Sequence, residues 1–264
     1  MFITRSDTPP APATSREAWK RSALLLVGHG SPRDGGANRA LEGHARALRR
    51  RGLFADVRAG ALHGSPPLSD AFGDLGAARV YVAPLFMCGG VYASRVVPRR
   101  LGLGGRITRV GGRRFYLCAP LGTAPGIGAL VVDRALALAR QRNMAPSSAT
   151  LLLVGHGSAK DGNARRAAEV HAAWARRRNA FKCVRTAFLE EEPYLLDELP
   201  ALSAPLIALG LFMAGDRHAD GDVPRLLAAG APQGSHYLGA IGTDAKIPDL
   251  ILSQVASFDA NFGP

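Results

Sequence analysis

The chain has 264 residues, of which 47% are hydrophobic and 20% charged, and its formal net charge at pH 7 is +12. This composition excludes a largely disordered chain, and the apolar runs are too short to span a bilayer, so we expect a cytoplasmic protein without a membrane segment. The basic excess suits an anionic partner, either a nucleic acid or a polycarboxylate small molecule, or merely a solubilising surface, and charge alone does not choose among them.

The predicted elements alternate between strands and helices. Residues 1–20 are rich in Pro, Ala, Thr and Ser and lack the apolar stretch of a secretion signal, so we expect a flexible tail. The uninterrupted apolar run Ala23–Gly28 predicts a strand buried on both faces, and Asn38–Arg51 has helical spacing that ends before Gly52. Further strands are predicted at Ala55–Leu62, Ala78–Ala83 and Arg114–Ala119.

The second half repeats this order. Strands are predicted at Thr150–Gly155, Cys183–Leu189, Pro205–Gly210 and Ser235–Ile241, and helices at Asn163–Arg178, Tyr194–Leu199, Asp222–Ala229 and Asp244–Phe258.

Two pairs of segments show that the chain contains an internal duplication. Leu24–Arg51 and Leu151–Arg178 both begin with LLLVGHGS and lie 127 residues apart, and Pro84–Pro98 (PLFMCGGVYASRVVP) matches Gly210–Pro224 (GLFMAGDRHADGDVP). We therefore predict an α/β protein of two duplicated lobes, each an open parallel sheet flanked by helices, with a cleft between the lobes. The predicted boundaries are a tail at 1–20, a first lobe at 21–143 and a second lobe at 144–264.

A Val-Gly-His-Gly-Ser segment follows the first strand of each half. It places His29 and His156 at the carboxyl ends of the strands, where parallel sheets bind ligands, and the flanking glycines let the backbone approach a ligand closely. Ser31 and Ser158 stand where a helix N-terminus could hold a carboxylate. The alternative is a tight turn whose histidine has no ligand.

His44 and His171 also repeat, fifteen residues beyond the first pair of histidines. They fall deep inside the predicted helices, about four turns from the strand ends, so we interpret them as structural.

The two halves differ at the second pair of matching segments. His218 occupies the position of Tyr92, and the run Glu190, Glu191, Glu192 has no acidic counterpart in Ala61–Pro66. Only the second half thus offers two imidazoles and a carboxylate from adjacent strand ends, a set that binds Co²⁺, Fe²⁺, Ni²⁺ or Zn²⁺. Imidazole also accepts protons near neutral pH. The alternative for the acidic run is a solvated helix N-terminus.

The cysteines do not supply a metal site. Cys88, Cys118 and Cys183 are scattered and form no CxxC pair, which argues against a disulfide framework and against cysteine-ligated zinc or iron–sulfur clusters. We interpret them as buried thiols.

The sequence resembles the class II chelatases, the sirohydrochlorin cobaltochelatases and ferrochelatases of CbiX, SirB and CbiK type. The resemblance covers Ala23 to Phe258 and is carried by HGS, then FLE with a Glu-Pro following, then Gly-x-x-His-x-x-x-Asp-x-Pro. The spacing from Gly215 to His218 is wider than the Gly-x-His of many members.

The resemblance implies site residues. His156, His218 and Glu190 would be catalytic, and these three with Glu192 would bind the metal, with either glutamate assisting. The first half would be a degenerate copy that keeps His29 and forms the opposite wall. The expected substrate-binding residues are Gly155, Gly157, Ser158, His29, Ser31, Tyr92, Arg95 and Arg217.

The implied activity is insertion of a divalent metal, Co²⁺ in the first place, into sirohydrochlorin or a related polycarboxylate tetrapyrrole, without ATP and in cobalamin biosynthesis. The metal is then a substrate, and no organic cofactor, nucleic acid or membrane is expected. A siroheme ferrochelatase, Ni²⁺ insertion and a non-catalytic metal or tetrapyrrole carrier are the alternatives. Two complete halves let a monomer suffice, and a homodimer stays open.

Overall fold

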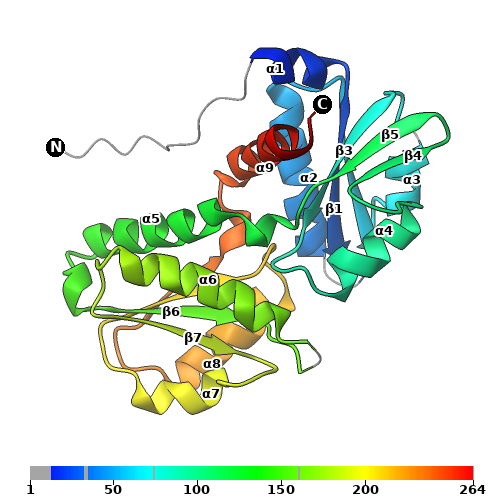
Figure 1. Ribbon diagram of the computed structural model, residues 1–264. Coiled ribbons are helices and arrows are strands. Elements are labelled where there is room, and N and C mark those ends of the chain that lie inside the picture. The colour runs from blue at the N-terminus through cyan, green and yellow to red at the C-terminus, as the bar shows by residue number, and fades with distance from the viewer. Residues whose placement is uncertain (1–12, 33–34, 74, 160, 264) are drawn as a thin grey trace.

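The protein consists of two β-sheets, one from each half of the chain, with helices on both sides of each sheet (Figure 1). The computed structural model describes residues 13–32, 35–73, 75–159 and 161–263. The first sheet has the order β2-β1-β3-β5-β4 and the second the order β7-β6-β8-β9. The strands of the first sheet are β1 (Ala23–Gly30), β2 (Asp56–His63), β3 (Arg79–Leu85), β4 (Ile107–Val110) and β5 (Arg113–Leu117), and those of the second are β6 (Thr150–Gly155), β7 (Cys183–Phe188), β8 (Leu206–Leu211) and β9 (His236–Ala240).

Both sheets have the same winding. In each half the chain goes from its first strand to a neighbour on one side and then crosses to the other side, so the winding reverses beside β1 and beside β6. The pairings of the named strands are parallel except that of β4 with β5. The predicted two-lobed α/β fold is therefore confirmed, with one antiparallel hairpin added.

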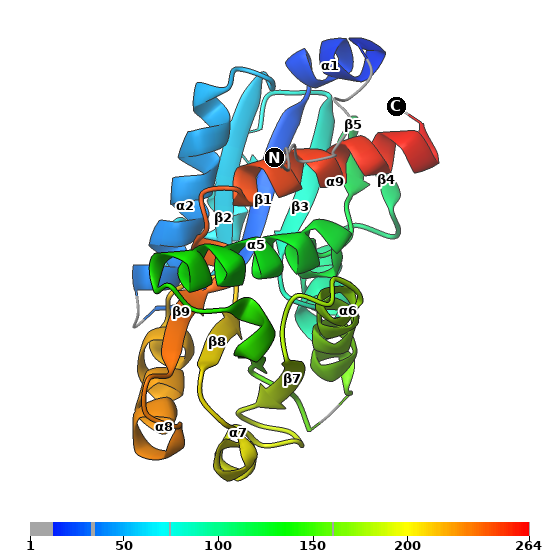
Figure 2. The same ribbon diagram turned by 90° about the vertical axis from the view of Figure 1, so that its left-hand side faces the viewer.

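The helices form a shared middle layer and two outer layers (Figure 2). One apolar core joins the inner faces of both sheets through four long helices, and separate clusters cover the outer faces. The middle layer holds α2 (Gly35–Arg50), α5 (Pro125–Gln141), α6 (Asn163–Arg177) and α9 (Ile247–Phe262), and the outer layers hold α3 (Leu68–Gly73), α4 (Val97–Arg100), α7 (Leu195–Glu198) and α8 (Val223–Gly230). Helices on both faces explain why β1 and β6 are apolar at successive positions rather than at alternate ones.

The last helix of each half packs on the other half's side of the molecule. Helix α5 lies against α6 and β8, whereas α9 lies against α2 and β3. Asp259 of α9 accepts hydrogen bonds from Trp19 Nε1 at 2.8 Å and from the Tyr81 hydroxyl at 2.6 Å. Side-chain packing thus crosses the predicted boundary at 143/144.

Three expectations differ from the structure. Residues 13–20, expected as part of a flexible tail, form α1 (Ala13–Lys20), because burial of Trp19 against Phe54 holds this segment on the first lobe; residues 1–12 lie outside the described residues. The strand predicted at Arg114–Ala119 is β5, but its hairpin partner β4 and the helix α5 were not predicted. Of the cysteines only Cys118 is buried, while Cys88 is half-buried and Cys183 is exposed on the edge strand β7.

None of the helices in the described part of the chain has the length and apolar character that a bilayer-spanning helix needs.

Candidate functional site

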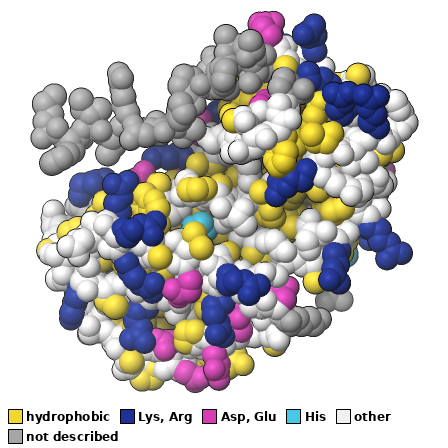
Figure 3. Space-filling view, in the orientation of Figure 1, with side chains coloured by type: hydrophobic (Ala, Val, Ile, Leu, Met, Phe, Trp, Pro, Cys, Tyr) yellow, Lys and Arg dark blue, Asp and Glu magenta, His cyan; other side chains and the backbone are white. Residues whose placement is uncertain are grey.

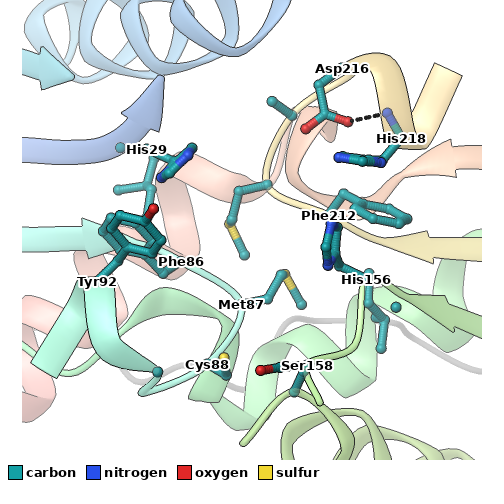
Figure 4. A pocket seen from close by; sticks show the side chains of 18 of the residues that line it. His29, Phe86, Met87, Cys88, Tyr92, His156, Ser158, Phe212, Asp216 and His218 are labelled. Carbon is teal, nitrogen blue, oxygen red and sulfur yellow. Dashed lines mark hydrogen bonds between the residues drawn. The ribbon is translucent and has the colours of Figure 1, made fainter. Parts of the chain in front are cut away.

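A cleft of about 1000 Å³ opens where the carboxyl ends of both sheets meet. Its walls are the loops that follow β1 and β3 in one half and β6 and β8 in the other, the positions beside which each sheet reverses its winding. Figure 4 shows His29 and Tyr92 on one wall and His156, His218 and Asp216 on the other. Apolar side chains lie between the walls, namely Leu85, Phe86, Met87, Leu211, Phe212 and Met213.

The loop after β6 is fixed by a buried carboxylate. Gly157 has φ +83°, and a Cβ there would lie 2.9 Å from the backbone nitrogen of Glu191, so this position requires glycine. Glu191 is 6% exposed; its Oε1 accepts the Ser158 N–H at 3.2 Å, and its Oε2 lies 3.5 Å from Nε of Arg165. Glu191 therefore anchors the His156 loop, a role that the sequence interpretation missed.

His156 presents one ring nitrogen to the cleft. Its Nδ1 lies 3.0 Å from the carbonyl oxygen of Gly157, and because a carbonyl only accepts, the neutral ring carries its proton on Nδ1. The other nitrogen, Nε2, keeps its lone pair and lies 3.7 Å from Oε1 of Glu190. The ring centroids of His156 and His218 are 4.5 Å apart, with an interplanar angle of 89°.

His218 is positioned by two aspartates. Oδ1 of Asp216 accepts the backbone N–H groups of His218 and Ala219, each at 3.0 Å, and this cap starts the turn Arg217–Asp222 (Figure 4). Oδ2 of Asp222 lies 3.0 Å from Nδ1 of His218. The ring then donates from Nδ1 and keeps its lone pair on Nε2, as in His156.

The surroundings of Asp222 favour the ionised form of its carboxyl. Desolvation raises the pKa of its carboxyl, but hydrogen bonds from His218 and Arg225 and the charge of Arg217 outweigh it, so the pKa lies below its ordinary value. The sequence did contain the signal, since His218 and Asp222 stand four residues apart in a turn that precedes a helix.

The other predicted residues fall into two groups, those that line the cleft and those that lie outside its lining. Gly155, Gly157, Ser158, Ser31 and Glu190 line it, as does Arg217, whose side chain is 83% exposed. Glu192 and Arg95 are exposed and lie outside the lining. Within the described residues, no three His, Cys, Asp or Glu side chains are arranged so that they could hold a metal ion.

The first-lobe wall contains a second aromatic cluster. The His29 ring lies 5.0 Å from that of His63 and 4.5 Å from that of Tyr92. Burial, and then the charge of His63, lower the pKa of His29, against an opposing effect of Asp216. The sequence interpretation expected His29 and Tyr92 to bind substrate but assigned no role to His63.

The two interior histidines make structural hydrogen bonds between the halves. His44 on α2 contacts the carbonyl oxygen of Gly242 through Nε2 at 2.8 Å, and His171 on α6 contacts that of Gly122 at 2.7 Å. Both side chains are buried away from the cleft.

On the face that Figure 3 shows, basic side chains are spread out rather than gathered in a single stripe. Acidic side chains lie among the basic ones of the lower lobe on this face.

Comparisons with known proteins identify the family of the chain. A family model described as CbiX matches residues 23–138 and 150–258. The probable sirohydrochlorin cobaltochelatase of Halobacterium salinarum is 26% identical over 272 residues, which cover 91% of this chain and 93% of that protein.

Two solved structures share the fold. A multi-domain protein of Deinococcus radiodurans, described as similar in structure to chelatases and as having two additional novel domains, is 30% identical with a TM-score of 0.76; the match covers 90% of this chain and 55% of that one. The structure of CbiX, described as the terminal enzyme for biosynthesis of siroheme in denitrifying bacteria, is 24% identical with a TM-score of 0.71, and the match covers 91% of this chain and 99% of that one. Because the family model matches most of both halves, the chain belongs to the CbiX family of metal chelatases.

Proposed function

We propose that the chain inserts Co²⁺ into sirohydrochlorin without ATP, as a step of cobalamin biosynthesis. The observation that carries the proposal is the pair of imidazoles 4.5 Å apart, whose Nδ1 atoms are both occupied by acceptors, beside Glu190 in an open cleft. The relative from Halobacterium salinarum, named a probable sirohydrochlorin cobaltochelatase, supports the choice of substrate and metal.

The chemistry requires acceptors for protons and donors for a cation. Two pyrrole N–H protons must leave the ring as the divalent metal enters, so that charge is conserved. The Nε2 lone pairs of His156 and His218 can each ligate the incoming ion or accept one of these protons. Glu190, which is 61% exposed, can pass a proton from His156 to solvent. Asp222 accepts the hydrogen bond from Nδ1 of His218 and so holds the tautomer and the orientation of the ring.

The substrate would lie flat between the two walls. The apolar side chains between the walls suit the face of a macrocycle, and Arg217 at the rim suits a peripheral carboxylate. Of the two arginines expected to bind substrate we retain Arg217, because Arg95 lies outside the cleft. One chain supplies both walls, so the proposal needs no second subunit.

A ferrochelatase acting in siroheme synthesis is the second candidate. It is favoured by the likeness to the CbiX structure described as the terminal enzyme for biosynthesis of siroheme. Two imidazoles and a carboxylate do not distinguish Fe²⁺ from Co²⁺, because affinity order alone rarely decides metal use.

The test is an insertion assay with purified protein, sirohydrochlorin and Co²⁺, Fe²⁺ or Ni²⁺ in parallel, followed by the visible spectrum. We expect the enzyme to accelerate Co²⁺ insertion most. Faster insertion of Fe²⁺ would favour the siroheme enzyme, and binding without acceleration would show a carrier.

A matched pair of variants separates the two candidate glutamates. Glu190→Gln should lower the insertion rate by roughly 100-fold, as expected for loss of a positioned acid–base group. Glu192→Gln is the control, because this neighbouring side chain is exposed outside the cleft lining, and it should keep the wild-type rate. The reverse order of effects would contradict the assignment.

A further inference from the structure

The first lobe has a donor set at the same place as the second-lobe site. In the first lobe, the residue before His29 is Gly28, which pairs with Ala61 of β2. In the second lobe, the residue before His156 is Gly155, which pairs with Phe188 of β7. Two residues beyond these partners stand His63 in the first lobe and Glu190 in the second. In the third position Tyr92 matches His218. Taken in the same order, the second-lobe set is His156, Glu190 and His218, and the first-lobe set is His29, His63 and Tyr92.

The first-lobe set keeps two imidazoles in a different arrangement. In the second lobe the imidazoles come from the first and third positions, and in the first lobe they come from the first and second. The His29 and His63 rings are 5.0 Å apart and inclined by 64°, against 4.5 Å and 89° for the second-lobe pair. Tyr92 lies edge-on to His29, with the ring centroids 4.5 Å apart.

The ring nitrogens of His29 and His63 are available to a ligand. Both side chains are exposed to the cleft that they line, and no described residue forms a hydrogen bond with either ring. The second-lobe imidazoles differ, since each has its Nδ1 occupied.

Charge in the cleft also favours a cation beside His29. Asp216 lines the opposite wall of the same cleft, so its carboxylate brings negative charge to the space that His29 faces. Neighbouring imidazoles are typical ligands of Co²⁺, Ni²⁺ and Zn²⁺.

We propose that His29 and His63 bind a second divalent ion of the Co²⁺, Ni²⁺ and Zn²⁺ class, on the wall of the cleft opposite His156 and His218. Two protein nitrogens leave the remaining coordination positions to water, so the ion is held more weakly than at a site that includes a carboxylate. The first lobe then forms an ion-binding wall of the cleft, and is not merely a copy of the second lobe that has lost its site.

The test is calorimetric titration of the full-length metal-free protein with Co²⁺ alone, without tetrapyrrole. Wild type should bind two ions. The double variant His29→Ala/His63→Ala should lose the weaker ion, and His156→Ala/His218→Ala should lose the tighter one and keep the other. His236→Ala, which removes an imidazole outside the cleft, is the control and should bind two.

Two results would overturn the inference. One is a His29→Ala/His63→Ala variant that still binds two ions with wild-type affinities, and the other is a His156→Ala/His218→Ala variant that binds none while its thermal unfolding stays cooperative. The proposed function would fail if the wild-type protein did not accelerate metal insertion. This titration measures binding of the ion and not insertion, so the two failures can be distinguished.

Discussion

At the scale of single residues, the site depends on which imidazole nitrogen is free. Gly157 and Asp222 occupy the Nδ1 atoms of His156 and His218, so the Nε2 atoms remain to bind a cation or a proton. At His218 the acceptor is a carboxylate, which fixes the tautomer and the orientation of the ring.

Asp222→Asn tests this positioning role. The variant keeps the shape of the side chain but loses the negative charge, so we expect the rate of metal insertion to fall by roughly 10- to 100-fold with little change in thermal stability. Asp220→Asn, an exposed change in the same turn, is the control and should behave as wild type. An unchanged insertion rate in Asp222→Asn would show that Asp222 is only structural.

The sequence was informative for residues that repeat or that differ between the halves. His29 and His156 stood out by repetition, and His218 by replacing Tyr92. Glu191 did not stand out, because three adjacent glutamates look alike in sequence and only the fold decides that the middle one is buried. His63 was overlooked because its role depends on its register beside β1.

At the scale of helices, two buried histidines join the halves. His44 and His171 sit at equivalent positions of α2 and α6, and each donates a ring N–H to a carbonyl of the other half. Burial lowers the pKa of both rings from the ordinary 6.5, although the backbone hydrogen bonds oppose it. The native state therefore binds protons less readily than the unfolded chain.

This difference predicts how stability depends on pH. With the native pKa below 6.5, the free energy of unfolding is undiminished above pH 6.5 and falls as the pH drops below that value, until the native rings also titrate. The measurement is chemical denaturation between pH 8 and about pH 5, above the range where most carboxylates titrate.

The control is the double variant His44→Gln/His171→Gln. Glutamine does not titrate and can still donate to a carbonyl, so its stability should change less across this range. His29, whose pKa is also lowered, contributes equally to both proteins. An equally steep fall in the double variant would contradict the assignment to His44 and His171.

Helix α5 shows why some elements escaped prediction. Glycines at its start weaken helix propensity, yet they allow close packing, since a Cβ at Gly128 would lie 3.2 Å from Trp174 and one at Gly126 would lie 2.5 Å from Leu250. The reason for these glycines is tertiary and cannot be read from periodicity. The hairpin β4–β5 turns through Gly111 and Gly112, both with positive φ, and its strand β4 is too exposed to give an apolar run.

At the scale of the whole molecule, the halves are joined by exchanged helices. The repeat correctly predicted two lobes, but it could not tell on which lobe each final helix packs. Because α5 and α9 cross over and one core joins both sheets, neither half can bury its inner face alone.

We therefore expect the lobes to unfold as one unit. The two tryptophans report separately, Trp19 from the first half and Trp174 from the second. Trp19→Phe and Trp174→Phe each leave one fluorescent reporter, and far-ultraviolet circular dichroism of the same variant gives the global transition. In each variant the midpoint from the remaining tryptophan should coincide with the global one. Separate midpoints would show that the lobes unfold independently.

The central claim is that metal insertion is carried out by the second-lobe imidazoles. The most direct measurement is the rate of Co²⁺ insertion into sirohydrochlorin by His156→Ala, His218→Ala and His29→Ala, each shown to be folded. We predict that the first two fall to the uncatalysed rate and that His29→Ala loses less. An active His218→Ala variant, or a loss in His29→Ala equal to that in His156→Ala, would contradict the account.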